Sequence, residues 1–312
     1  MSKIMSYARA LRIPHAASLA VIGFVLAAPA ACSSSLDPTV ASRGSAQNDL
    51  DAGGAPAVPA SGDSGPPAQT APPGTHWMPK PGTSWQWQLS TTGSIDTSFD
   101  VQVYDIDLYE SSTAFISSLK AAGRKVVCYF DTAYEPGRPD SALLDPHKHN
   151  PVTGWPGQYW LDVRVPAVVD VMKARIALAQ SKGCDGIEAD DVDSLSNNPG
   201  TGITAVEQQA FIKTLAAEAH AHGMGYALKS DIADIQAVLE DVDFDINEQC
   251  FKYGECDALA PFIAAGKAVF DVEYTEGDLS SAASQVCPPS NAMNFDTLIK
   301  HLDLGATRYA CR

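Results

Sequence analysis

Basic residues are scarce in this chain. Its 312 residues include 21 lysines and arginines against 37 acidic residues, which gives a formal net charge of −16. So acidic a surface repels phosphate groups, which argues against a nucleic-acid partner and against an anionic membrane surface. The charge fits a cationic partner, or it serves to keep an exported protein soluble.

An apolar run long enough to cross a membrane is also missing. The run AASLAVIGFVLAAPAA within residues 1–32 is too short for that, but it follows three basic residues, as in a signal peptide. Cys32 comes directly after it and before three serines, which is typical of a bacterial lipoprotein whose cysteine is acylated. Pro29 departs from that pattern, so cleavage after Ala-Pro-Ala without a lipid is the alternative. We expect an exported protein, lipid-anchored in the cell envelope or secreted, with no other membrane attachment.

Residues 33–75 lack the large apolar side chains that a folded core requires. Serine, alanine, glycine, proline and aspartate dominate the segment. Burial of such residues does not offset the entropy lost on folding, so we expect a disordered tether. The remaining roughly 235 residues, 76–312, have the usual size of a single (β/α)8 barrel domain.

Short β-rich runs alternate with helical patterns from residue 77 onward, as in a parallel sheet with crossover helices. No glycine-rich phosphate fingerprint follows any run, which argues against a nucleotide cofactor and against a doubly wound open sheet, the second fold considered. We predict an α/β fold, a TIM-like (β/α)8 barrel, without a cofactor. The eight predicted strands are 84–89, 101–108, 125–130, 186–192, 226–230, 244–249, 267–274 and 307–311.

Two helices are predicted clearly by the residues at their N-terminal ends. Thr204 with Glu207 three residues later forms a capping box before a helix over 205–222. Pro166 suits the first turn of a periodic helix that extends to Lys182.

Apart from Cys32, the chain has six cysteines, an even number that indicates disulfides in an oxidising compartment. We expect the pairs Cys250–Cys256 and Cys287–Cys311. Cys128 and Cys184 either bond to each other or remain small buried thiols.

Polar residues gather where the predicted strands end, which in a barrel is the mouth that carries the chemistry. Converging carboxylates suit either glycoside cleavage or binding of Mg²⁺ or Ca²⁺. The chain has no EF-hand spacing and too few well-spaced histidines for zinc, and His220 and His222 are expected at a solvent-facing helix end without a role. Because aromatic residues cluster with these acids, we favour sugar chemistry and expect no metal.

The loop 132–165 after the third predicted strand is long and holds the motifs AYEPGRPD and GWPGQYWLDVR. A loop of this length at the mouth is typical of a binding wall. Arg138 within it would either clamp a substrate group or pair with Glu135 or Asp140.

These motifs together resemble glycoside hydrolase family 114, which contains endo-α-1,4-polygalactosaminidases with TIM-like barrels. The resemblance extends over residues 77–312 and leaves only the leader and the tether uncovered. Its motifs are WQWQL (85–89), VYDIDL (103–108), GRKVVCYFDTAYEPGRPD (123–140), GWPGQYWLDVR (154–164), GCDGIEADDVD (183–193), LKS (228–230), INEQCFKYGEC (246–256) and GKAVFDVEY (266–274).

The resemblance implies that Asp190 and Glu248 are the two catalytic carboxylates. We assign Asp190 as nucleophile and Glu248 as general acid/base, a retaining arrangement that needs carboxyl groups about 5 to 5.5 Å apart. A separation of about 6.5 to 9.5 Å would favour inversion, and the two roles are interchangeable at this stage. Asp191 stands where the family commonly has asparagine, and it adds a charge beside the proposed nucleophile.

The resemblance also implies a galactosamine-rich, cationic polysaccharide as partner, attracted by an acidic cleft. A non-catalytic polysaccharide-binding barrel on the cell surface is the alternative function, and a monomer is the expected state. The residues expected to bind substrate are Trp87, Asp105, Asp107, Tyr129, Tyr134, Glu135, Arg138, Trp160, Asp193, Lys229, Asn247, Glu273 and Tyr274.

Overall fold

The computed structural model describes residues 76–90 and 94–312. The predicted signal peptide, Cys32 and the tether over 33–75 lie outside the described residues. Within the described ranges, no helix combines the length and apolarity needed to span a bilayer.

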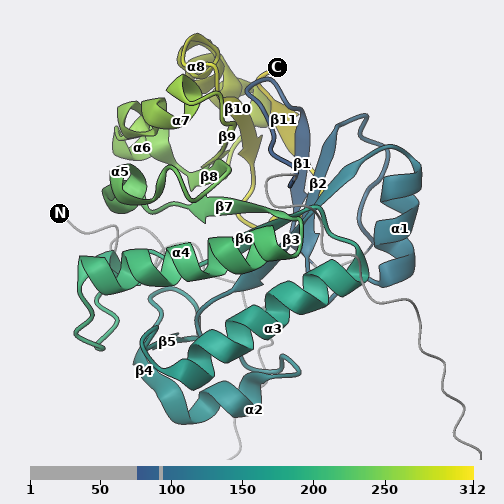
Figure 1. Cartoon of the computed structure of the whole chain (residues 1–312). Helices are drawn as coiled ribbons and strands as arrows, with labels where there is room; N and C mark the ends of the chain where they lie inside the picture. Colours follow the sequence, from purple (N-terminus) through teal and green to yellow (C-terminus); the bar gives the residue numbers. More distant parts are fainter. Residues whose placement is uncertain (1–75, 91–93) are drawn as a thin grey trace, which may run out of the picture. The chain divides into compact units, whose positions relative to one another are not determined.

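A curled, mainly parallel sheet forms the centre of the domain (Figure 1). Eight of its strands are mutually parallel, and the last strand runs antiparallel to its neighbour β10. In spatial order the strands are β1 (Trp85–Gln88), β2 (Val103–Asp107), β3 (Lys125–Asp131), β6 (Gly186–Asp190), β7 (Gly225–Lys229), β8 (Phe244–Glu248), β9 (Val269–Tyr274), β10 (Asp296–Lys300) and β11 (Arg308–Ala310).

The two ends of this curved sheet meet. The indole nitrogen of Trp85 in β1 donates to the backbone oxygen of Asp296 in β10 over 2.7 Å, and the Gln86 amide donates to the oxygen of Ala306 over 2.8 Å. The Trp85 ring also stacks on Phe270 of β9, with centroids 4.6 Å apart. The predicted TIM-like barrel fold is therefore confirmed.

Side chains alternate between the two faces of each strand and so build two apolar cores. The inner core fills the curl of the sheet with residues such as Val127, Phe244 and Phe270. A larger outer core, which includes Ile106 and Ile187, packs the sheet against its helices. Both faces of the sheet are therefore buried, as a parallel sheet requires.

The helices lie outside the sheet (Figure 1). Helix α4 begins with the predicted capping box between Thr204 and Glu207, and α3 begins at Pro166 and ends before Gly183, whose positive φ closes it. The α-helices are α1 (Thr113–Ala121), α2 (Ser141–Leu144), α3 (Pro166–Lys182), α4 (Ala205–Ala221), α5 (Ile235–Val238), α6 (Cys250–Tyr253), α7 (Ala260–Ala264) and α8 (Leu279–Ala292). Single 3-10 turns are η3 (Asp145–His147), η4 (Ser194–Asn197), η5 (Ile232–Asp234) and η6 (Cys256–Leu259).

The last predicted strand needs correction. The run at 307–311 is β11, which pairs antiparallel with β10, and the eighth parallel strand is β10 itself, DTLIK at Asp296–Lys300. Residues 301–307 are too few for a helical crossover, so the following strand must return antiparallel. The long loop at 132–165 also contains α2 and a small hairpin of β4 (Lys148–Pro151) and β5 (Tyr159–Leu161).

Three disulfides tie the domain together. The predicted pairs Cys250–Cys256 and Cys287–Cys311 are confirmed. Cys128 of β3 bonds to Cys184, which precedes β6, so the question left open for these two residues is answered by a third disulfide.

Candidate active site

Three charged residues end three neighbouring strands. Asp190 is the last residue of β6, Lys229 of β7 and Glu248 of β8. Parallel strands end at the same edge of the sheet, so these side chains converge at the mouth of the barrel, with the lysine between the two acids.

The residue that follows each of these three strands has a left-handed backbone conformation, with a positive φ angle. Asp191 has φ 60°, Ser230 has φ 52° and Gln249 has φ 65°, although none of them is glycine. Non-glycine residues adopt this conformation at a cost of order 1 kcal/mol or more, and such residues cluster at functional sites. The three turns share one geometry and hold the preceding side chains at the mouth.

Lys229 is the centre of the charged group, with its side chain only 1% exposed. Its ammonium nitrogen lies 2.6 Å from Glu188 Oε1, 3.2 Å from Asp190 Oδ2 and 3.9 Å from Glu248 Oε2. Burial by itself would lower the pKa of Lys229, but the surrounding carboxylates raise it well above its usual range. The lysine therefore stays charged.

The distances from Lys229 bound the separation of the two candidate catalytic acids. Asp190 Oδ2 and Glu248 Oε2 are no farther apart than the sum of 3.2 and 3.9 Å, about 7 Å. Two carboxylates at this spacing reach one glycosidic bond from opposite sides.

Trp87 and Glu188 form the floor beneath the lysine. The Trp87 indole nitrogen donates to Glu188 Oε2 over 2.9 Å, and the Lys229 nitrogen lies 4.9 Å from the centre of the indole ring. Asp105 lies fully buried beside Glu188, and burial together with that neighbouring carboxylate raises its pKa well above the usual range. Burial raises the pKa of Glu188 as well, but Lys229 and a hydrogen bond from Asp105 lower it, so of the two acids Glu188 is the one whose negative charge faces Lys229.

Asp190 and Glu248, both partly buried, each accept a hydrogen bond from a tyrosine. The Tyr129 hydroxyl donates to Asp190 Oδ2 over 3.1 Å, and the Tyr274 hydroxyl donates to Glu248 Oε1. Burial, and then the charge of Asp190, raises the pKa of Tyr129, which keeps its hydroxyl protonated as a donor. The tyrosines thereby fix the orientation of both carboxylates.

The extra acid at position 191 is neutralised locally. Asp191 and Asp131 share a hydrogen bond. Burial and the charge of Asp131 raise the pKa of Asp191 well above its usual range, whereas burial and Asp190 raise that of Asp131 to about 6. One proton shared by this pair leaves one negative charge beside Asp190 instead of two, which lowers the repulsion on Asp190.

A cleft opens over these residues, and the β4–β5 hairpin provides one of its walls. Trp155 in the turn of that hairpin is 43% exposed, and its indole ring is available to an incoming ligand. Aromatic rings suit the apolar faces of sugars. The cleft is lined by Trp87, Leu89, Tyr129, Val152, Thr153, Trp155, Trp160, Asp190, Asp191, Asp193, Asn197, Ser230, Glu248, Tyr253, Tyr274, Leu302 and Leu304.

The structure brings about half of the predicted site residues together. Lys229 lies directly beneath the cleft and Asp105 deeper still. The predicted residues that line the cleft are Trp87, Tyr129, Trp160, Asp190, Asp193, Glu248 and Tyr274.

Three predicted residues pair with one another instead. Arg138 contacts Glu135 over 2.6 Å and Asp107 over 2.7 Å, and none of the three is a lining residue of the cleft described above. Of the two roles considered for Arg138, the structure supports the loop contact: Glu135 is a partner as expected, and Asp107 is a second partner that was not expected. Asp140, the other partner considered, binds the buried Arg175.

The other predicted residues support the site from outside the cleft. Asn247 and Glu273 alternate with inward-facing residues of β8 and β9 and are buried on the outer face of the sheet. Glu273 accepts a hydrogen bond from the Phe251 amide over 2.7 Å, and burial raises its pKa to about 7. Tyr134 packs against Tyr159 of the hairpin.

Several residues of the site were missed. Glu188 lies in the GIEAD motif, but its side chain lies beneath that of Asp190. Tyr253 lies in the motif around Cys250, where no strand end indicates that its side chain faces the cleft. Side chains alternate along β6, so Glu188 and Asp190 lie on the same face of the sheet; this alternation could have predicted that Glu188 belongs to the site.

Comparison with known proteins identifies the family of the chain. The model of glycoside hydrolase family GH114 matches residues 66–312, starting ten residues before the predicted domain boundary. The chain belongs to this family. The family resemblance drawn from the motifs is confirmed, and the chain is a glycoside hydrolase.

Solved structures show the same fold. The crystal structure of Aspergillus fumigatus Ega3 in complex with galactosamine is 37% identical with a TM-score of 0.71, and the match covers 75% of this chain and 97% of that one. The glycoside hydrolase domain of PelA from Pseudomonas aeruginosa has a TM-score of 0.58 at 12% identity, covering 73% and 98% of the two chains, and supports the fold alone. A search of curated proteins gave no match.

Proposed function

We propose that this GH114 hydrolase cuts α-1,4-linked, galactosamine-containing polysaccharide at internal bonds, with Asp190 and Glu248 as the catalytic carboxylates. The observation that carries the proposal is the placement of both acids within about 7 Å, on either side of the Lys229 ammonium, at the mouth of the barrel. The relative Ega3 was crystallised with galactosamine, which supports an amino sugar as the ligand.

The charge of the cleft fits such a substrate. Asp190, Asp193 and Glu248 line it, whereas the one lysine beneath it is already surrounded by carboxylates. Free amino groups on the sugar are cationic at neutral pH, so they are attracted to this surface. The net charge of −16 extends the same attraction to the whole polymer.

In the proposed retaining mechanism, Asp190 attacks the anomeric carbon while Glu248 donates a proton to the departing glycosidic oxygen. A water molecule, deprotonated by Glu248, then attacks the anomeric carbon and releases Asp190. The nucleophile must be ionised. Both acids accept a hydrogen bond from a tyrosine, but Asp190 has the shorter contact with the Lys229 ammonium, 3.2 Å against 3.9 Å for Glu248. These contacts favour Asp190 as nucleophile and Glu248 as acid/base.

The test is release of reducing ends from partially deacetylated α-1,4-galactosamine polymer. We expect Glu248→Gln to lower turnover by at least about 100-fold, in the range of general acid catalysis. Glu240→Gln, at an exposed acid that follows α5 and does not line the cleft, serves as the matched control and keeps full activity. Binding without cleavage by the wild type would instead favour the polysaccharide-binding barrel.

The products decide the finer points. Masses of fragments from defined oligomers distinguish internal from terminal cleavage. Proton NMR of freshly released ends shows the α-anomer if the configuration is retained and the β-anomer if water attacks directly.

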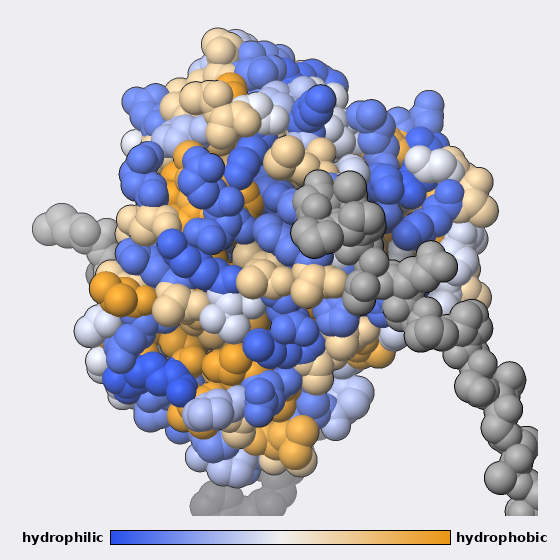
Figure 2. Space-filling model, in the orientation of Figure 1, coloured by the Kyte–Doolittle hydropathy of each residue, from blue (hydrophilic) through white to orange (hydrophobic). Residues whose placement is uncertain are grey.

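We further propose that the protein is exported and acylated at Cys32, and that it acts as a monomer. The face seen in Figure 2 is largely hydrophilic, with apolar residues in scattered patches, which suits a monomer. Detergent partitioning of the wild type against Cys32→Ser tests the anchor, and light scattering of the soluble variant tests the monomer.

A further inference from the structure

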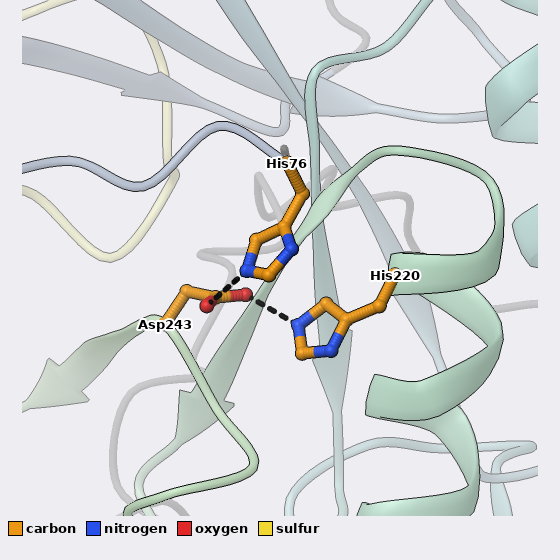
Figure 3. A group of neighbouring side chains, drawn as sticks. All are labelled: His76, His220 and Asp243. Carbon is orange, nitrogen blue, oxygen red and sulfur yellow. Dashed lines mark hydrogen bonds and ion pairs between the residues drawn. The ribbon is translucent and has the colours of Figure 1, made fainter. Parts of the chain in front are cut away.

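A second group of potential ligands lies at the opposite end of β8 from the active site. Glu248 ends this strand, whereas Asp243 directly precedes it. Asp243 is approached by His220 from the last turn of α4 and by His76, the first residue that the structure describes (Figure 3). None of these residues takes part in the proposed reaction.

Both imidazole rings point the same atom at the same carboxylate. His76 Nε2 lies 2.7 Å from Asp243 Oδ1, and His220 Nε2 lies 2.7 Å from Oδ2. The rings are stacked with centroids 3.9 Å apart and planes only 10° from parallel (Figure 3). The two ring nitrogens and the carboxylate all lie within 4.8 Å of one another.

We propose that His76, His220 and Asp243 bind a divalent transition-metal ion, with Zn²⁺ as the best-fitting candidate. Two imidazole nitrogens and one carboxylate oxygen suit Zn²⁺, Cu²⁺ or Ni²⁺, whereas Ca²⁺ and Mg²⁺ prefer oxygen alone. The histidine side chains are 21% and 27% exposed, so water can reach the ion and complete its coordination.

Binding requires both rings to move. Ligand atoms about 2.0 to 2.1 Å from a tetrahedral Zn²⁺ lie about 3.3 Å from one another, so each ring would move by roughly half an ångström from the carboxylate. The two ring nitrogens, which lie within 4.8 Å of each other, would tilt toward the shared ion. The ion takes the place of the hydrogen-bonded protons. The Tyr226 amide, which donates to Asp243 Oδ2 over 2.8 Å, holds the carboxylate in place during that change.

The ion would fasten the start of the domain to the barrel. The chain after His76 runs tightly along β7, where a Cβ atom on Gly225 would stand 2.3 Å from the Trp77 backbone oxygen. Trp77 itself packs edge-on against Phe244. Since His76 lies 167 residues from Asp243 in sequence, a shared ion joins segments that otherwise meet only by packing and hydrogen bonds.

The first experiment is calorimetric titration of the EDTA-treated full chain with ZnCl₂. We expect one tight ion per chain, and a loss of at least about tenfold in affinity in either His76→Ala or His220→Ala. His222→Ala is the matched control, because His222 lies two residues from His220 and contacts Glu218 instead. It should bind as the wild type does.

Two further measurements keep the test decisive if one variant folds poorly. Co²⁺ bound at this site gives visible absorption bands that His76→Ala abolishes. Saturating Zn²⁺ raises the melting temperature of the wild type by at least about 3 °C, but not that of His76→Ala, because the ion binds only the folded state.

Hydrolysis should proceed at the same initial rate with and without EDTA, which separates this site from the catalytic one. Absence of tight Zn²⁺ binding, or binding that survives both His76→Ala and His220→Ala, would overturn the metal site. Either result would leave the proposed polysaccharide hydrolysis untouched.

Discussion

The Lys229 ammonium and the Glu188 carboxylate lie 2.6 Å apart in the fully buried floor of the cleft. Glu188 balances the lysine from below, whereas Asp190 and Glu248 approach it from the cleft. Burying charges is costly unless they are paired, so this group persists only because each charge has a partner. The lysine is therefore a positioning residue for both proposed catalytic acids, Asp190 and Glu248.

Replacement of this lysine by a neutral residue of similar length should disable the enzyme. Lys229→Met leaves three carboxylates facing one another, which repel and take up protons. We expect activity to fall at least about 100-fold, and the free energy of unfolding to fall by about 3–5 kcal/mol, as for other broken buried ion pairs. Initial rates at 25 °C and denaturant unfolding measure the two effects.

Lys300→Met is the matched control for this experiment. Lys300 is also fully buried, but its ammonium group donates to the backbone oxygens of Gly305 and Thr307 rather than to acids. This variant should lose stability yet keep its turnover. Equal losses of turnover in the two variants would show that Lys229 acts on the fold and not on the carboxylates.

The two tyrosines allow the catalytic roles to be tested separately. A hydroxyl that donates a hydrogen bond to a carboxylate favours the ionised form of that carboxylate. Removing the hydroxyl therefore raises the pH at which the carboxyl group ionises. Tyr129→Phe should move the acidic limb of the kcat/KM profile to higher pH, because that limb reports the ionised nucleophile. Tyr274→Phe should instead move the alkaline limb upward, because that limb reports the protonated acid.

The expected shifts are about half a pH unit or more, with a loss in kcat of roughly tenfold for one charge-assisted hydrogen bond. The opposite pattern, with Tyr129→Phe moving the alkaline limb, would exchange the roles of Asp190 and Glu248. Each variant serves as the control for the other, since both remove one hydroxyl from a cleft residue.

Periodicity and end signals in the sequence were sufficient for most of the fold. The capping box at Thr204 and the proline at 166 correctly predicted where α4 and α3 begin. Strand β10 was missed because its five residues, DTLIK, begin and end with a charged residue and follow a helix that contains prolines. The direction of β11 depends on how β10 pairs, so local sequence could not reveal it.

The site was predictable only where position along a strand decides which way a side chain points. Asp190 and Glu248 end their strands, so the barrel geometry placed them correctly at the mouth. The pairing of Arg138 with Asp107, 31 residues away, depends on how the loop packs. The same limit applies to His76, whose approach to Asp243 depends on the tertiary fold.

Buried acids should make the domain less stable as pH rises. Burial, and then the charge of Asp234, raises the pKa of Asp231 to about 8, so the folded protein keeps a proton that the unfolded chain loses near pH 4. The folded state binds more protons between these values, so the free energy of unfolding falls from about pH 4 to about pH 8 and then levels off. Glu273, with a pKa raised by burial to about 7, contributes in the same direction.

Asp231→Asn should flatten this dependence and stabilise the domain at pH 8 relative to the wild type. Chemical unfolding at a series of pH values measures the slope. Asp257→Asn, at an exposed acid, should leave the slope unchanged. A wild-type stability that rises steadily from pH 5 to pH 8 would contradict the proposed burial of protonated acids.

The disulfides should differ in their effect on stability according to the loops they close. Cys128 and Cys184 are 56 residues apart, and loop-closure entropy predicts a loss of about 4 kcal/mol when both are replaced by alanine. Cys250 and Cys256 are only 6 residues apart, for which the same relation gives about 2 kcal/mol. Denaturant unfolding of the two double variants measures the difference. A larger loss in the short pair would mean that this disulfide acts on the native turn after Glu248, and the variant would then also lose activity.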